Sequence, residues 1–226
     1  MLRFLLCFSS LVVVSNSLKL FPRRSFLPAL VLGSPSLASA FNNGTPASKM
    51  PSSTPKRPGP VPKDLSLKPR EALEGKMGLR SCSPGYHCFT TTGDAELDYY
   101  FTIPLWEPPT KSTTSPLLDV AGVVDSYPVP NSGVDGGGFQ FVERRKDYVY
   151  VVFESEKKGF RDDVEFALVD GGKVAVRTSS RVGYLDFGVN AKRLNYVSAQ
   201  LRKQGWQAPA ISRETHGEYW EQNGMK

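Results

Sequence analysis

The feature that most constrains the fold is the stretch from residue 139 to residue 179, where apolar residues recur with the period of two that is typical of β-strands. Charged or glycine-rich segments interrupt this pattern and indicate turns. The pattern predicts four strands joined as two hairpins, over residues 139–143 and 148–154, and then over residues 164–169 and 173–179. We therefore expect an antiparallel sheet of about four strands at the centre of the fold.

The second hairpin indicates its own register through its loop. A three-residue loop, Asp170-Gly171-Gly172, places Phe166 opposite Val176 and Glu165 opposite Arg177. All apolar residues then lie on one face, and opposite charges meet on the other. A two-residue Gly-Gly loop would instead place Phe166 opposite Arg177. We predict the three-residue loop, which also supplies a glycine for the left-handed position that such loops require.

Two segments with helical periodicity flank the predicted strands. The first begins at Ser115-Pro116, a hydroxyl N-cap followed by proline, and ends at Tyr127-Pro128. The second runs from about residue 186 to residue 203 and carries a stripe formed by Phe187, Asn190, Leu194, Val197 and Leu201. Because these stripes must be buried, the predicted fold class is α+β: a single domain with an antiparallel sheet of about four strands and two helices packed on one face.

Composition divides the chain into four parts. Residues 1–40 combine arginines with apolar runs and contain no acidic residue, which is typical of a cleavable targeting leader. Residues 41–74 are rich in proline and serine, and we expect a disordered, solvated linker there. The globular domain is predicted over residues 75–207. Residues 208–226 are expected to form a polar tail, within which Tyr219-Trp220 could dock.

The leader contains two export-like segments in succession. The first, over residues 1–17, has an arginine, an apolar run and small polar residues. In the second, the twin arginines Arg23-Arg24 precede a mildly apolar stretch that ends in the cleavage pattern Ala38-Ser39-Ala40. This layout resembles the layered presequences of algae whose plastids lie inside the endomembrane system, and it predicts the thylakoid lumen. Two alternatives stay open: the plastid stroma, with a transit peptide that begins at Phe41, and simple secretion.

Charge and motif content argue against several classes of function. The net charge is +6, but four of the 28 basic residues and none of the 22 acidic residues lie in the leader. The chain after the leader therefore carries only +2, which gives poor support for nucleic-acid binding. No later segment is apolar over the roughly 20 residues that a membrane span needs. The chain lacks a nucleotide-binding glycine loop and a nucleophile elbow, and neither His87 nor His216 has a triad-like context. We expect no nucleic-acid partner, no cofactor and no catalytic set.

Two cysteines follow the leader, Cys82 and Cys88, and the five residues between them include the turn signal Pro84-Gly85. Such a turn would bring the two thiols together, and a disulfide is plausible in an oxidising compartment. A structural zinc site would need four ligands, and His87 is the one further candidate nearby. We favour a disulfide over a metal site, and the spacing lacks the Cys-x-x-Cys pattern of a redox-active pair.

Polar residues concentrate in two segments, 161–166 and 177–190. The predicted register brings these segments together, with Asp163 facing Ser179, and it places Arg181 just beyond the strand end near Asp162. The candidate cluster consists of Asp162, Asp163, Glu165, Arg177, Ser179, Ser180, Arg181, Asp186 and Asn190.

Three motifs carry a resemblance to a known family. The segments RDDVEF and VRTSSRVGYLDFGVNAKRLNY closely resemble the C-terminal signature of the domain of unknown function 1499 family, and CSPGYHC is similar to its N-terminal cysteine motif. The usual asparagine before the second cysteine is replaced here by His87. The resemblance extends from about Arg80 to Trp206. It implies a common fold and a bacterial or plastid setting, but no biochemical activity.

The polar cluster allows two interpretations. In the structural one, pairs of acids and arginines fix the corner between the sheet and the last helix, Asp186 or a serine caps that helix, and Asn190 binds loop backbone. In the functional one, Arg177 and Arg181 hold an anionic ligand while a neighbouring acid transfers protons. We favour the structural interpretation because alternating acids and arginines form such networks more often than active sites.

The predicted function is a non-catalytic binding or assembly factor of the thylakoid lumen, whose partner is a thylakoid membrane protein complex. The alternative is an enzyme or a small anionic-ligand binder that uses the polar cluster.

Overall fold

The computed structural model describes residues 58–226, apart from residues 95, 112–113, 129–136 and 157. The predicted leader, the first part of the predicted linker and most of the glycine-rich loop before the first hairpin lie outside the described residues.

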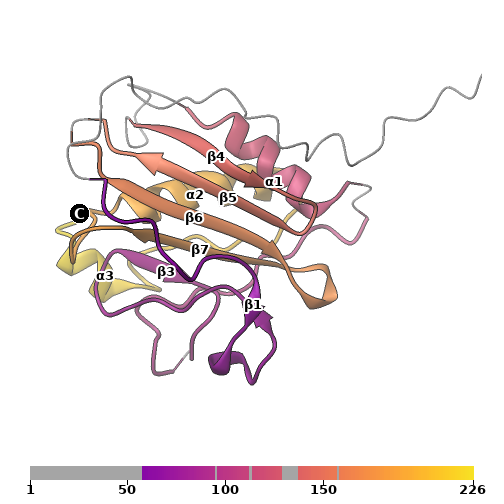
Figure 1. Cartoon of the computed structure of the whole chain (residues 1–226), viewed down its shortest axis with the longest axis horizontal. Coiled ribbons are helices and arrows are strands. Elements are labelled where there is room, and N and C mark those ends of the chain that lie inside the picture. The colour runs from indigo at the N-terminus through magenta and orange to yellow at the C-terminus, as the bar shows by residue number, and fades with distance from the viewer. Residues whose placement is uncertain (1–57, 95, 112–113, 129–136, 157) are drawn as a thin grey trace, which may run out of the picture. The chain divides into compact units, whose positions relative to one another are not determined.

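The described chain is built around a five-stranded antiparallel sheet, with the strand order β3-β7-β6-β5-β4 (Figure 1). The strands are β3 (Cys88–Thr90), β7 (Val174–Ser180), β6 (Arg161–Leu168), β5 (Tyr148–Glu154) and β4 (Gly138–Arg144). Four of them correspond to the predicted hairpins. The fifth, β3, corrects the predicted count. Because it spans only three residues directly after the cysteine turn, alternation could not reveal it.

The predicted register of the second hairpin is confirmed. Phe166 lies opposite Val176, and Glu165 lies opposite Arg177. The loop is a short 3-10 turn, η3 (Asp170–Gly172), whose glycines both have a φ of 75°. A side chain would be strained in this left-handed conformation, so the glycine pair determines the loop and the loop determines the register.

Two helices, α1 (Pro116–Asp125) and α2 (Val189–Lys203), cover one face of the sheet and contact each other. In Figure 1, α2 lies behind β5 and β6, on the far face of the sheet. The core between the helices and the sheet includes Leu117, Val120, Val151, Phe166, Leu194 and Leu201.

The start of α2 differs from the prediction. Phe187 was expected on the buried stripe, but it precedes the helix and is 71% exposed. Both Phe187 and Gly188 have positive φ angles, 56° and 81°, so neither residue can begin the helix.

The opposite face of the sheet is covered by residues 58–80, which we call the N-terminal strap. The strap contains a small two-stranded sheet of β1 (Lys68–Pro69) and β2 (Met77–Gly78), with a 3-10 turn, η2 (Glu71–Leu73), between them. Leu65, Leu67 and Leu79 pack against the sheet from this side. The strap therefore differs from the solvated linker expected up to residue 74.

The C-terminal residues also differ from the polar tail that their composition suggested. Residues 217–222 form the helix α3 (Gly217–Gln222), and Ile211 and Tyr219 are buried in the main core. The expectation that Tyr219-Trp220 could dock holds for Tyr219, which is fully buried, and Trp220 is partly buried against the same core.

Candidate functional site

Strand alternation divides the predicted polar cluster between the two faces of the sheet. Asp163, Glu165 and Arg177 point to the strap side, whereas Asp162 contacts α2 on the helix side. Neighbouring residues in a strand face opposite ways, so Asp162 and Asp163 cannot serve one site. The predicted single cluster is therefore two separate networks.

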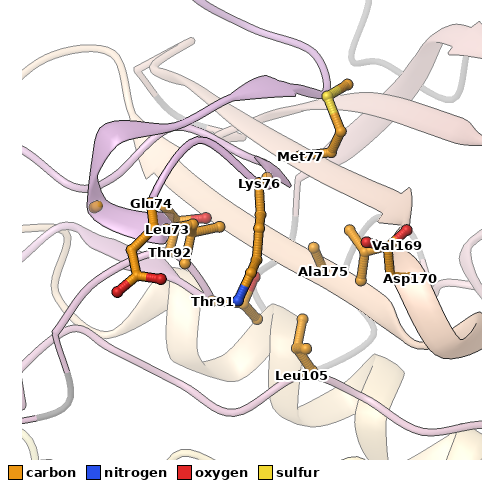
Figure 2. Close-up of a pocket in the computed structure, with 12 residues that line it drawn as sticks. Leu73, Glu74, Lys76, Met77, Thr91, Thr92, Leu105, Val169, Asp170 and Ala175 are labelled. Atoms are coloured by element: carbon orange, nitrogen blue, oxygen red, sulfur yellow. The ribbon is translucent and has the colours of Figure 1, made fainter.

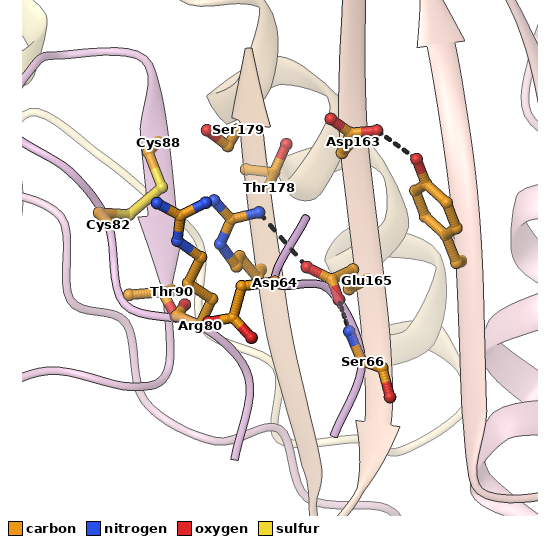
Figure 3. A network of polar contacts seen from close by, with 12 residues as sticks. Asp64, Ser66, Arg80, Cys82, Cys88, Thr90, Asp163, Glu165, Thr178 and Ser179 are labelled. Carbon is orange, nitrogen blue, oxygen red and sulfur yellow. Dashed lines mark hydrogen bonds and ion pairs between the residues drawn. A yellow bond between two sulfur atoms is a disulfide. The ribbon is translucent and has the colours of Figure 1, made fainter. Parts of the chain in front are cut away.

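The first strap-side group is centred on Glu165. Its carboxylate lies 3.3 Å from Arg177 Nη1 and accepts a hydrogen bond from the Ser66 backbone N–H at 2.8 Å (Figure 3). It also accepts one from the Tyr148 hydroxyl at 2.7 Å. The two charged side chains are 0% and 4% exposed. Burial and the neighbouring carboxylate raise the pKa of Tyr148, so the phenol remains a hydrogen-bond donor.

The second strap-side group is centred on Asp163. Arg181 donates to both carboxylate oxygens, from Nε at 3.0 and 3.1 Å and from Nη2 at 2.8 Å. The Tyr150 hydroxyl donates to Asp163 and accepts from Arg181 at 3.0 Å. The prediction that Arg181 lies near Asp162 is wrong at the level of side chains: its partner is Asp163, and its side chain is 3% exposed.

The helix-side network joins the sheet to α2. Asp162 forms an ion pair with Arg193, a fully buried residue of α2. Asn190, one turn earlier, accepts from the Thr178 hydroxyl and donates to Ser180 Oγ at 3.1 Å. It also donates to the backbone carbonyl of His87 at 3.0 Å, so it binds loop backbone as predicted.

Asp186 caps α2 as predicted. Its carboxylate accepts from the backbone N–H groups of Gly188 at 2.9 Å and Asn190 at 3.1 Å, and from the hydroxyl of Tyr219 on α3 at 2.7 Å. Burial raises the pKa of Asp186, and these hydrogen bonds oppose the shift. Asn223 accepts in turn from the Asp186 N–H, so α3 is tied to the start of α2.

The predicted disulfide between Cys82 and Cys88 is confirmed, with a Cα–Cα distance of 5.8 Å. Cys88 lies opposite Ser179 in the sheet, next to Arg177. The Ser179 hydroxyl makes one long contact, 3.4 Å to the Ser180 carbonyl.

Several residues of these networks escaped the sequence reasoning. Tyr148 and Tyr150 alternate with valines on β5, so a register for β5 against β6 would have placed them on the acid-bearing face. Arg193 lies three positions after Asn190 and four before Val197, so helical spacing places it on the predicted stripe of α2. Ser66 had no signal, because a proline-rich segment does not indicate which backbone N–H faces the sheet.

A pocket of about 400 Å³ lies between the strap and the β6–β7 hairpin (Figure 2). Lys76, Met77, Leu105 and Ala175 line it together with Thr92, whose buried hydroxyl has no partner among the described residues. None of the network acids lines this pocket. The pocket therefore offers hydrogen-bonding and apolar contacts, and the acid–arginine pairs of the two networks lie outside it.

A cluster of tyrosines lies at the end of the sheet where the disulfide loop meets residues 184–187. Ring centroids are 5.6 Å apart for Tyr86 and Tyr184, and 5.9 Å apart for Tyr86 and Tyr100 and for Tyr99 and Tyr100. We call these four residues the tyrosine cluster. Glu218 of α3 accepts hydrogen bonds from Tyr86 and, at 3.1 Å, from Tyr99. The pKa of Tyr86 is raised to about 12, mainly by its hydrogen bond to Glu218.

The described part of the chain contains no group of three or more His, Cys, Asp or Glu side chains placed to hold a metal ion. Among the helices that the structure describes, none is long and apolar enough to cross a membrane.

Comparison with known proteins gives one match. No curated protein and no solved structure matches the chain. The family described as "Protein of unknown function (DUF1499)" matches residues 79–201, more than half of the 226 residues. This range contains β3 to β7, α1, all but the last two residues of α2, and all of the network residues except Ser66 of the strap and those of the C-terminal segment. The resemblance of the sequence motifs is thus confirmed, and the chain belongs to the DUF1499 family.

Proposed function

We propose that the domain is a non-catalytic binding protein that supports a membrane-protein complex in the thylakoid lumen of a plastid. One observation carries the non-catalytic part of this proposal. Asp163 and Glu165, the acids best placed for proton transfer, are fully buried and hold arginines and tyrosines. An acid committed to a buried ion pair is out of reach of substrate, so it suits a structural role.

The location in the lumen is proposed from the leader and is supported by the disulfide. Twin arginines before a second apolar segment suit export across the thylakoid membrane. The Cys82–Cys88 bridge suits an oxidising compartment, since cytosolic proteins rarely keep such bonds. The plastid stroma and the secretory route are the competing destinations that the experiment below separates.

The tyrosine cluster, together with the exposed Phe187, is the proposed docking surface. Tyr99 and Tyr184 are 55% and 58% exposed, and the neighbouring Phe187 is 71% exposed. Exposed aromatic side chains are enriched where proteins bind proteins. Phe187 also has a φ of 56°, a conformation that costs a non-glycine residue roughly 1–2 kcal/mol. An exposed aromatic residue kept at a strained position contributes nothing to the core, which favours a role in binding.

The charges around the tyrosine cluster favour a basic partner. Burial raises the pKa of the Tyr100 hydroxyl, and the nearby carboxylates of Asp98 and Glu218 raise it further. Aromatic faces next to carboxylates attract lysine and arginine side chains through cation–π and ionic contacts. The proposed occupant is therefore a lysine- or arginine-rich surface of the membrane complex.

Plastid fractionation of cells that express the tagged full-length chain tests the proposal. We expect the chain in the lumen, co-migrating with one membrane complex, and we expect Tyr99→Ser and Phe187→Asn to weaken that co-migration. Phe187→Asn should also raise the free energy of unfolding by up to about 1 kcal/mol, since asparagine tolerates the left-handed conformation. Val142→Ser is the matched control, because Val142 is a 56% exposed apolar residue on β4.

The proposal fails if the chain is found wholly free of any complex or outside the plastid. It also fails if Val142→Ser weakens co-migration as much as Phe187→Asn does, because the tyrosine cluster would then have no special role.

A further inference from the structure

Two like charges lie together on the strap side of the sheet. Arg80, at the end of the strap, is partly exposed, and Figure 3 shows its guanidinium beside the guanidinium that binds Glu165, which belongs to Arg177. Burial lowers the pKa of Arg177, and the charge of Arg80 adds to this effect, while the carboxylates of Glu165 and Asp163 oppose it. The two arginines therefore repel each other in a site where Glu165 can neutralise only one of them.

The acids around Arg80 are already engaged. Glu165 pairs with Arg177, and Asp163 pairs with Arg181. Asp64, which lies in the same view, pairs with two other basic side chains of the strap (Figure 3). No acid of the described chain lies within ion-pair distance of the Arg80 guanidinium. One positive charge at this position is thus left without a counterion from the described residues.

Unused hydrogen-bond donors accompany this charge. Arg177 is 3% exposed, and its Nε has no hydrogen-bond partner among the described residues. Among the described residues, the hydroxyl of Ser179, the next residue of β7 on the same face, makes only its long contact to a neighbouring carbonyl. A buried donor without an acceptor costs about 1–3 kcal/mol, so an incoming acceptor would be favoured here.

We propose that Arg80, Arg177 and Ser179 form a binding site for a small oxyanion, such as a carboxylate, sulfate or phosphate group, which enters from the exposed side of Arg80. Guanidinium groups bind the planar or tetrahedral oxygens of such anions with paired N–H donors. One negative charge neutralises the excess positive charge, and its oxygens accept from Arg177 Nε, which has no partner among the described residues, and from the weakly bonded Ser179 hydroxyl. The site is separate from the tyrosine cluster, so it goes beyond the docking function proposed above.

The test measures binding of sodium sulfate, inorganic phosphate and acetate to the full chain by calorimetry and by thermal unfolding, with sodium chloride at matched ionic strength as the reference. We expect at least one oxyanion to bind and to raise the melting temperature above the chloride reference, and Arg80→Gln to weaken binding at least tenfold. Arg213→Gln, which removes an exposed arginine of the C-terminal segment, should bind as the wild type does. The order of the three anions identifies whether a carboxylate or a tetrahedral oxyanion is preferred.

The same variant separates a binding role from a structural one. Arg80→Gln removes the repulsion with Arg177, so in chloride alone it should melt at the wild-type temperature or above it. The proposal is overturned if no oxyanion exceeds the chloride reference, if Arg80→Gln binds as tightly as the wild type, or if Arg213→Gln loses binding equally. A lower melting temperature of Arg80→Gln in chloride would also overturn it, because Arg80 would then stabilise the fold without a ligand.

Discussion

Glu165 on β6 and Arg177 on β7 lie directly opposite each other, and their side chains form a buried ion pair of 3.3 Å on the face of the sheet that the strap covers. Neither side chain reaches water, so each charge depends on the other for its stability in the interior. This relationship shows what the polar signature does: it fastens the strap to the sheet, since Glu165 also accepts from the Ser66 N–H.

Breaking this pair from one side should be costly. Glu165→Gln leaves Arg177 as a buried charge without its partner, and we expect the free energy of unfolding to fall by about 3–5 kcal/mol. Arg177→Met leaves Glu165 in the same position and should cost a similar amount. The double variant should lose less than the sum of the two, as measured by urea denaturation. Fully additive losses would show that the two charges do not interact.

The disulfide should contribute modestly to global stability. The bridge joins residues six apart in sequence, and a loop that short restricts the unfolded chain by about 2 kcal/mol in the chain-entropy description. Replacing both Cys82 and Cys88 by serine should lower the free energy of unfolding by about that amount and leave the far-ultraviolet circular dichroism unchanged. If the double variant fails to fold, the bridge has a larger role than a local staple of the turn.

The C-terminal helix should be part of the cooperative fold. The Tyr219 hydroxyl donates to the buried carboxylate of Asp186, so Tyr219→Phe should lower the free energy of unfolding by about 1.5–3 kcal/mol. Tyr196→Phe is the matched control, because the Tyr196 hydroxyl makes a longer bond, 3.3 Å, to the backbone carbonyl of Ser126. We expect a small effect for this control, and equal effects of the two variants would show that the bond from Tyr219 to Asp186 adds no special stability.

His216 should make stability depend on pH. Burial lowers its pKa below the usual 6.5, so the unfolded chain takes up a proton at a higher pH than the folded chain does. The folded state is therefore favoured by this group above pH 6.5, and that advantage is lost as the pH falls from 6.5 toward the folded pKa. We expect His216→Gln to flatten the dependence between pH 7.5 and pH 5.5. His87→Gln, at the other and partly exposed histidine, should retain the wild-type slope, and an unchanged slope in His216→Gln would contradict the assignment.

The elements governed by local rules were predictable. The glycine loop Asp170–Gly172 and the opposed charges set the register of the β6–β7 hairpin, and Ser115-Pro116 marked the start of α1. The disulfide followed from two cysteines around a turn. Each of these features depends on residues close together in sequence, which is why pattern and turn chemistry sufficed.

The features that depend on distant contacts were not predictable. The strap up to residue 74 was expected to be a linker because its proline content outweighed Leu65 and Leu67, the two leucines that pack on the sheet. The helix α3 was expected to be part of a tail because Tyr219 is its one buried residue. The partner of Arg181 was misplaced because side-chain direction beyond a strand end depends on the tertiary fold. Arg80 was overlooked for the same reason, since the strap and β7 are nearly one hundred residues apart.

The measurement that tests the central claim most directly is the free energy of unfolding of Arg181→Ala. If Arg181 holds Asp163 and Tyr150 in a buried structural network, the loss should be about 3–5 kcal/mol, whereas Arg145→Ala, at an exposed ion pair, should lose less than about 1 kcal/mol. A wild-type stability for Arg181→Ala, together with loss of anion binding, would contradict the account and make Arg181 a ligand-binding residue.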